Sequence, residues 1–233
     1  MEMSITPEAR KFHMLSIDIG IKNLGFSVLN YDKLGKKTFS DFDILFDIFD
    51  ISKHLKKRGD IVNSRCEALS EWMKCLLSSF GTFERVIIER QVNRNTMAME
   101  LMYAIVMMCQ IMIPEAEIII FDPKDKFLKL GLTYETKNKA HKKQSVRYAK
   151  RLIDTFYVDL SQTFGEFDKK DDVSDAINQA FVWLFHNGLL NYDLNEYLQI
   201  IGEAVSVDEQ PTPTKRQMRK KVSSDDEATT DTD

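Results

Sequence analysis

With 233 residues, of which 43% are hydrophobic and 29% charged, the chain has the composition of a globular protein large enough for one α/β domain. No apolar run approaches the roughly 18–20 residues that span a bilayer, and the N-terminus lacks the apolar stretch of a secretory signal, so we expect an intracellular protein without a membrane partner. The net charge of −4 does not exclude nucleic acid, because ten Lys or Arg and only three Asp or Glu lie between Asp122 and Arg151.

The N-terminal part of the chain predicts an antiparallel meander followed by a helix. Met14–Ile19 and Leu24–Asn30 are apolar runs around a glycine-containing turn, which indicates strand, turn and strand. A third strand is expected around Thr38–Leu45, and 48–57 is either a loop or a short helix. Asp60–Phe80 has apolar residues at steps of three or four, as an amphipathic helix does.

The remaining elements alternate between strands and helices. They are expected at Glu84–Glu89 (strand), Asn95–Ile113 (helix), Glu117–Phe121 (strand, followed by a short helix to Leu130), Lys139–Phe156 (helix) and Asp171–Asn187 (helix). This order predicts an α/β fold with a mixed central sheet, an initial antiparallel β-meander and helices on both faces. We expect one domain over 1–204, and a disordered charged tail over 205–233, where few apolar residues are available for burial.

Four carboxylates stand where apolar residues are expected or where a helix begins. Asp18 lies inside the first strand, Glu89 ends a later strand, and Asp172 and Asp175 share one face of the last helix. Each has a plainer interpretation: Glu89 can pair with a nearby Arg, Asp172 can favour the helix dipole, and Asp175 can be solvated. As a set they predict a site for a divalent metal, because clustered carboxylates repel unless a cation intervenes, and oxygen ligands suit Mg²⁺.

Three motifs resemble those of RuvC-like Holliday junction resolvases of the RNase H-like superfamily, in family order. They are Ser-Ile-Asp-Ile-Gly-Ile-Lys-Asn-Leu-Gly at 16–25, Val-Ile-Ile-Glu-Arg-Gln at 86–91, and Lys-Lys-Asp-Asp-Val-Ser-Asp-Ala at 169–176. The first is most similar to the poxvirus and fungal mitochondrial branches. The resemblance covers roughly residues 14 to 187.

The resemblance implies an RNase H-like fold and a homodimer that makes symmetric paired nicks in four-way or otherwise branched DNA. It implies that Asp18, Glu89, Asp172 and Asp175 are catalytic metal ligands, with Asp171 as an alternative to Asp172. Two Mg²⁺ ions per active site, or Mn²⁺, are expected, one to activate water and one to stabilise the leaving 3′ oxygen. A viral enzyme would act in the host-cell cytoplasm, and a cellular one in the nucleus or mitochondrion.

Basic residues near these motifs are candidate phosphate contacts, although a solvated helix face is the common explanation of a charge run. The candidates are Lys22, Arg90, Arg94, Lys137, Lys139, Lys142, Lys143 and Arg147. Bacterial resolvases often carry an aromatic residue after the second acidic strand, whereas residues 92–96 here are mainly polar and basic. A stacking wedge at the junction is therefore not expected from this segment.

Two other functions remain open from the sequence. An RNase H-like nuclease acting on RNA or hybrids, as in YqgF-like proteins, would share the opening Asp-x-Gly motif. A junction-binding protein without cleavage belongs to a different class, and the complete set of four acids argues against it. A preference for four-way DNA over RNA duplexes would exclude the first alternative, and nicking of the junction would exclude the second.

Overall fold

The computed structural model describes residues 14–31, 36–54, 61–91, 95–134 and 138–203. The chain divides into two units, Met1–Glu203 and Ala204–Asp233, and all described residues belong to the first. The charged tail expected over 205–233 therefore lies outside the described residues. None of the described helices combines the length and apolar character needed to cross a bilayer.

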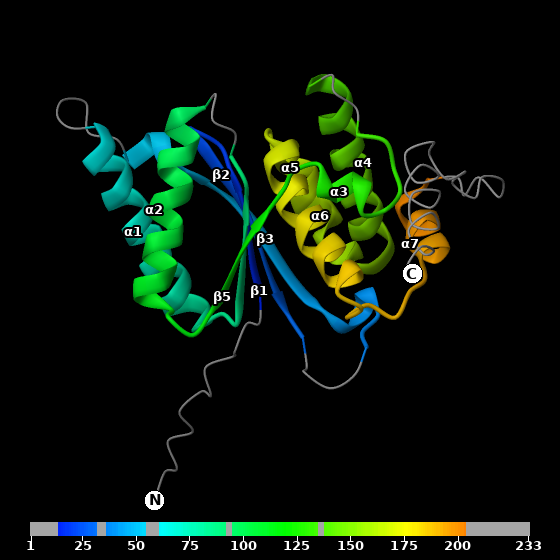
Figure 1. Ribbon diagram of the computed structural model, residues 1–233. Coiled ribbons are helices and arrows are strands. Elements are labelled where there is room, and N and C mark those ends of the chain that lie inside the picture. The colour runs from blue at the N-terminus through cyan, green and yellow to red at the C-terminus, as the bar shows by residue number, and fades with distance from the viewer. Residues whose placement is uncertain (1–13, 32–35, 55–60, 92–94, 135–137, 204–233) are drawn as a thin grey trace, which may run out of the picture. The chain divides into compact units, whose positions relative to one another are not determined.

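A five-stranded mixed sheet forms the centre of the first unit, in the order β3-β2-β1-β4-β5 (Figure 1). The strands are β1 Met14–Ile19, β2 Asn23–Asn30, β3 Asp43–Asp50, β4 Arg85–Glu89 and β5 Glu117–Phe121. The first three pair antiparallel, while β4 and β5 extend the sheet in parallel with β1. The predicted mixed sheet with an initial meander is confirmed.

The third strand lies further along the chain than the sequence predicted. The expected Thr38–Leu45 begins with a short 3-10 turn, η1 Phe39–Asp41, and the strand itself covers Asp43–Asp50. Pairing with the whole length of β2 sets this position, since Asn30 lies opposite Asp43 and Asn23 opposite Asp50. The segment left open as loop or short helix thus contains the end of β3 and the 3-10 turn η2 Ile51–His54.

Helices cover both faces of the sheet, as predicted (Figure 1). One layer contains α1 Ile61–Phe80 and α2 Thr96–Met112, and the opposite layer contains α3 Asp125–Leu128, α4 Asn138–Phe156, α5 Ser161–Glu166, α6 Lys170–His186 and α7 Leu194–Ile201, with the 3-10 turn η3 Val158–Leu160. The short α5 and α7 were not predicted, because six and eight residues show too little periodicity to be recognised. The longer helices agree with their predicted ranges to within one or two residues wherever they are described.

Strand β1 is buried on both sides, so its residues contact two different helical layers. Leu15, Ile17 and Ile19 belong to the apolar core shared with α1 and α2. Because neighbouring side chains in a strand point to opposite faces, Ser16 and Asp18 face the layer that contains α6. A carboxylate on this buried face requires polar partners there.

Candidate active site

Strand alternation and register bring Asp18 and Glu89 together on the α6 side of the sheet. In β4, Val86 and Ile88 belong to the α1–α2 core, so Glu89 points to the opposite face. The parallel register pairs Ile17 with Ile88, so Asp18 and Glu89 follow side by side at the carboxyl ends of neighbouring strands. Carboxyl ends of parallel strands are common positions for functional groups in α/β folds.

Helix α6 is fixed over β1 and β2 by hydrogen bonds to side chains that would otherwise be unsatisfied in the core. The hydroxyls of Ser16 and Ser27 donate to the carbonyl oxygen of Ala176, at 2.7 and 3.1 Å. Gln179 donates in turn to the carbonyl oxygen of Ile17, at 2.9 Å. These contacts fix the rotation of α6, so that Asp175 faces the two strand carboxylates.

Gly25 of β2 permits the close approach of the first turn of α6. A Cβ atom at this position would lie 2.3 Å from the carbonyl oxygen of Asp172, which is too close without a backbone shift. Glycine is therefore required here by the proximity of the helix backbone, which explains its place in the opening motif.

We expect Gly25→Ala to lower the free energy of unfolding by about 1–3 kcal/mol, the range for overpacked interiors. It also moves the α6 carboxylates away from β1, so nicking activity falls with stability. Urea unfolding measures the first effect. Gly165→Ala is the matched control, since nothing lies within 4 Å of a Cβ at this helical position. Equal stability of the two variants would contradict the close packing of α6 on Gly25.

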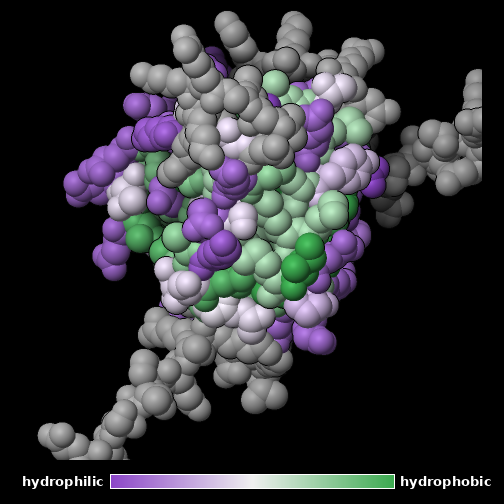
Figure 2. Space-filling view, turned by 90° about the vertical axis from the view of Figure 1, so that its left-hand side faces the viewer, coloured by the Kyte–Doolittle hydropathy of each residue, from purple (hydrophilic) through white to green (hydrophobic). Residues whose placement is uncertain are grey.

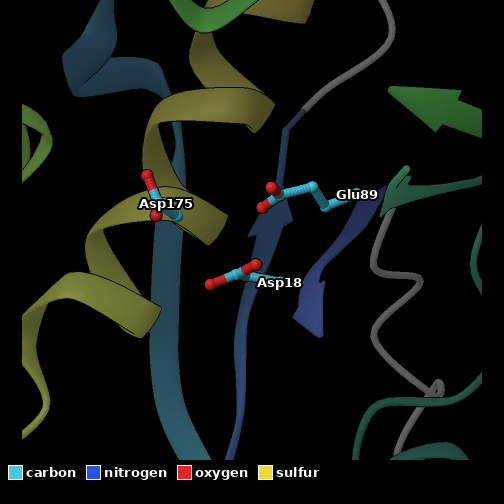
Figure 3. Close-up of side chains that lie close together, drawn as sticks. All are labelled: Asp18, Glu89 and Asp175. Atoms are coloured by element: carbon cyan, nitrogen blue, oxygen red, sulfur yellow. The ribbon is translucent and has the colours of Figure 1, made fainter. Parts of the chain in front are cut away.

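Asp18, Glu89 and Asp175 point toward one another from two strands and a helix (Figure 3). One carboxylate oxygen of each lies within 4.8 Å of the others. Asp175 also accepts a hydrogen bond of 2.6 Å from the Ser145 hydroxyl of α4, and Asn178 donates to that same hydroxyl at 2.8 Å. We call Asp18, Glu89 and Asp175 the acidic cluster.

A buried lysine, which the sequence analysis missed, neutralises part of the acidic cluster. Lys126 of α3 is only 4% exposed, and its ammonium lies 2.8 Å from Asp175 Oδ1 and 3.3 Å from Glu89 Oε2. A signal was present in the sequence: Lys126 stands beside Phe127 and four residues before Leu130, both almost fully buried, on the apolar side of a short helix. A charge at such a position requires an ionic partner.

The protonation of the cluster reflects this balance of burial and charge. Burial and the neighbouring Glu89 raise the pKa of Asp18 well above its usual value. Burial also acts to raise the pKa of Glu89, but the Lys126 ammonium and a hydrogen bond with Asp18 outweigh it and lower that pKa. In Lys126, the surrounding carboxylates outweigh burial and raise the pKa, so its charge is retained.

The fourth predicted acid, Asp172, lies one helical turn before Asp175 and outside the acidic cluster. It lines a separate cavity of about 400 Å³ together with Lys22, Asn95 and Lys169. Its neighbour Asp171 is ion-paired with Lys142, whose ammonium outweighs burial and lowers the pKa of Asp171. Of these two acids, Asp171 is therefore the one in an ion pair. Burial and the charge of Asp171 raise the pKa of Asp172 to about 6.

Removing Asp172 is expected to change the pH dependence of stability in the absence of metal. Its folded-state pKa of about 6 exceeds the ordinary value of 3.8, so its protonated form favours the folded state and this contribution is lost as pH rises from about 4 through about 6. Relative to wild type, Asp172→Asn should therefore gain stability over this pH window in EDTA. Urea unfolding across the window measures the difference between the two proteins. A difference that does not vary with pH would show that Asp172 titrates normally.

The predicted basic residues are distributed around the site rather than in it. Lys22, Arg90, Lys142, Lys143 and Arg147 are exposed. Arg147 is ion-paired with Glu203, which follows α7, and Lys142 is paired with Asp171 of α6, so the charge of α4 is partly neutralised. Arg94, Lys137 and the side chain of Lys139 lie outside the described residues.

Comparison with solved structures finds the same fold in three proteins of low sequence identity. Fowlpox virus resolvase, in a complex with substrate Holliday junction DNA, is 17% identical with a TM-score of 0.51, covering 74% of this chain and 96% of that chain. Thermus thermophilus RuvC is 14% identical with a TM-score of 0.50, covering 76% and 96%. The yeast mitochondrial Holliday junction resolvase Ydc2 is 18% identical with a TM-score of 0.54, covering 83% and 86%.

These likenesses confirm the expected RNase H-like fold and the resemblance to RuvC-like resolvases. No curated protein sequence matches this chain. A family profile described as Poxvirus A22 protein matches residues 13–187, which include β1, β4 and α6 with all four predicted acids. The chain therefore belongs to the Poxvirus A22 protein family.

Proposed function

We propose that this chain is a structure-selective DNA endonuclease that resolves four-way junctions by paired symmetric nicks. The convergence of Asp18, Glu89 and Asp175 from β1, β4 and α6 carries the proposal, because the RNase H-like fold brings three acids from distant segments to one point. The fowlpox resolvase, which shares the fold, forms a complex with Holliday junction DNA. The corresponding substrate for this chain is a four-way or otherwise branched DNA.

The acidic cluster fits divalent metal ions, with Mg²⁺ first and Mn²⁺ as the alternative. Its donors are all carboxylate oxygens within 4.8 Å of one another, the ligand type that Mg²⁺ prefers. Asp172, one turn away on α6 and outside the ion pair of Asp171 with Lys142, extends this donor set toward a second ion. When bound, two such ions supply an activated water and stabilise the leaving oxygen of the phosphodiester.

The protein's own residues then hold the cluster and the DNA in place. Ser145 and Lys126 orient Asp175, and Lys126 limits repulsion among the carboxylates before metal binds. Lys22 lies in the cavity beside Asp172, and Arg90 follows Glu89 directly, so both can contact phosphates next to the cut. Such contacts position DNA without reading its sequence.

A homodimer is part of the proposal, because paired nicks at a two-fold junction require two active sites. The outer face of the α1–α2 layer carries a broad hydrophobic surface (Figure 2). On α2, an exposed apolar row repeats every four residues, formed by Tyr103 (56% exposed), Met107 (60%) and Ile111 (75%). An exposed apolar face of this kind is typical of a protein interface, and we assign it to a second copy.

Ile111→Asp should therefore convert a dimer into a monomer, because it introduces a charge into the apolar contact. The mass in solution, measured by light scattering, is expected to fall by half, and paired nicks are expected to become single ones. Val158→Asp, at another exposed apolar position (66% exposed) on η3, is the control and should remain dimeric. An unchanged mass for Ile111→Asp would exclude this face as the interface.

The substrate class is tested with four substrates of matched sequence: a synthetic four-way DNA junction, a linear DNA duplex, an RNA duplex and an RNA–DNA hybrid. We expect Mg²⁺-dependent nicking of the junction and none of the duplex. Preferential cutting of RNA or the hybrid would favour the YqgF-like alternative, and tight junction binding without nicks would favour a non-cleaving binder. For a viral protein of this family, the host-cell cytoplasm is the compartment we propose.

A further inference from the structure

A second hollow adjoins the acidic cluster on the α3–α4 side. It measures about 220 Å³ and shares Glu89, Lys126 and Asp175 with the cluster. Its other wall consists of aromatic and polar side chains, including Phe127, Tyr134 and His141. The volume is below the roughly 300 Å³ of the smallest typical small-molecule sites, so it fits part of a larger ligand. We call it the aromatic pocket.

The wall of the aromatic pocket presents stacked rings. Tyr134 is stacked on the His141 imidazole, with ring centroids 5.5 Å apart and planes 25° from parallel. The buried ring of Phe127 supports Tyr134 from another side at 5.8 Å. Rings held in this way offer a rigid flat surface, and flat aromatic surfaces are what unpaired bases stack on.

The same wall holds a buried polar atom without a partner. His141 Nδ1 is inaccessible to solvent and has no hydrogen-bond partner among the described residues. Because this atom has no accessible surface, a ligand in the pocket cannot reach it, and His141 contributes to the wall through its ring. Arg90 and Gln91 line the pocket too, and side chains of these types make paired hydrogen bonds to the edges of guanine and adenine.

Both aromatic side chains lie close enough to the acidic cluster to be influenced by it. Burial acts to raise the pKa of Glu89, and His141 is among the groups that lower it, after Lys126 and Asp18. Burial raises the pKa of Tyr134, with smaller opposing effects of Lys126 and Glu89. Because the aromatic pocket and the acidic cluster share Glu89 and Asp175, a nucleotide in the pocket would lie next to a phosphate at the carboxylates.

We propose that the aromatic pocket binds the base adjacent to the scissile phosphate, stacking it on the wall of Tyr134 and His141 and reading its edge with Gln91. The inference rests on the proposed nuclease function and gives it a specificity determinant. It predicts that the protein prefers certain bases at the cut, and that this preference depends on Tyr134 and Gln91 rather than on the carboxylates.

Binding without cleavage tests the stacking. In the Asp18→Asn background, junctions carry the fluorescent base 2-aminopurine at each position around the crossover in turn. At one position we expect stacking to quench the fluorescence, Tyr134→Phe to retain the quenching, and Tyr134→Leu to relieve it. Quenching that is absent at every position, or that persists in Tyr134→Leu, would overturn the proposal. This result does not depend on whether the wild-type protein cuts.

Cut-site preference tests the reading of the base edge. Across junctions with each of the four bases at the cut, wild type should differ by about tenfold in kcat/KM between best and worst, and Gln91→Ala by about twofold, as expected for loss of one base contact. Gln162→Ala, at an exposed glutamine of α5, is the control. Thermal unfolding of each variant separates altered preference from reduced folding. An unchanged preference in Gln91→Ala would contradict the inference, while a wild type that cuts no junction would contradict the proposed function itself.

Discussion

Asp18→Asn is expected to reduce junction nicking by at least about 10³-fold, because it removes a ligand whose metal ions contribute several kcal/mol to transition-state stabilisation. Junction affinity should change little, since phosphate contacts come from the surrounding basic residues. Single-turnover nicking and gel-shift binding on the same junction measure the two quantities. Loss of both together would indicate a misfolded site rather than a missing ligand.

The fold should tolerate this substitution. Burial and Glu89 raise the pKa of Asp18, which favours its neutral form in the absence of metal, and an amide of the same shape replaces that form closely. Asp47→Asn, on the exposed side of β3, is the matched control and should nick at the wild-type rate. Nicking by Asp18→Asn within tenfold of wild type would remove Asp18 from the proposed active site.

Lys126→Met should lower the free energy of unfolding of the metal-free protein by about 3–5 kcal/mol, the cost of removing one partner from a buried ion pair. The change leaves Glu89 and Asp175 without their common counter-charge in a buried site. Nicking should fall by roughly 10- to 100-fold, as for other residues that orient metal ligands. Urea unfolding in EDTA and in Mg²⁺ measures the stability effect.

Metal should rescue Lys126→Met more than wild type, because added cations replace the lost charge and binding stabilises the folded state. The control is Lys129→Met on the same short segment, where a more exposed pair with Asp125 at 3.3 Å contributes at most about 1 kcal/mol. If Lys126→Met is no less stable than Lys129→Met in EDTA, the ammonium does not offset the carboxylates as inferred.

The sequence predicted those parts of the site that break a local pattern. Asp18 interrupts an apolar strand, Glu89 ends one, and Asp175 shares a helix face with Asp172, so each was visible from its immediate neighbours. The central strands and long helices were predictable for the same reason, since their apolar periodicity extends over many residues.

Features that depend on distant segments were not predictable. The position of β3 follows from its pairing with β2 rather than from its own sequence, in which exposed Asp43 and Asp47 alternate with apolar residues. The pairing of Arg147 with Glu203 joins residues 56 positions apart. A prediction from periodicity alone treats any lysine or arginine in a charged segment as solvated. Lys126 was overlooked for this reason.

The aromatic pocket is another feature that could not be predicted from the local sequence. Tyr134 and His141 lie in different local elements, and only the packing of α3 and α4 beside β4 brings them next to Glu89. Neither residue breaks an apolar pattern, so no local rule singled them out.

Cleavage of a supercoiled plasmid that extrudes a cruciform would show directly whether this chain resolves junctions. Two symmetric nicks made during one binding event convert the circle to a linear product with ligatable 5′-phosphate and 3′-hydroxyl ends. We predict linear product with Mg²⁺, none with EDTA, and none with Asp18→Asn. Accumulation of nicked circles without linear product, or no cleavage with any divalent ion, would contradict resolution by paired nicks.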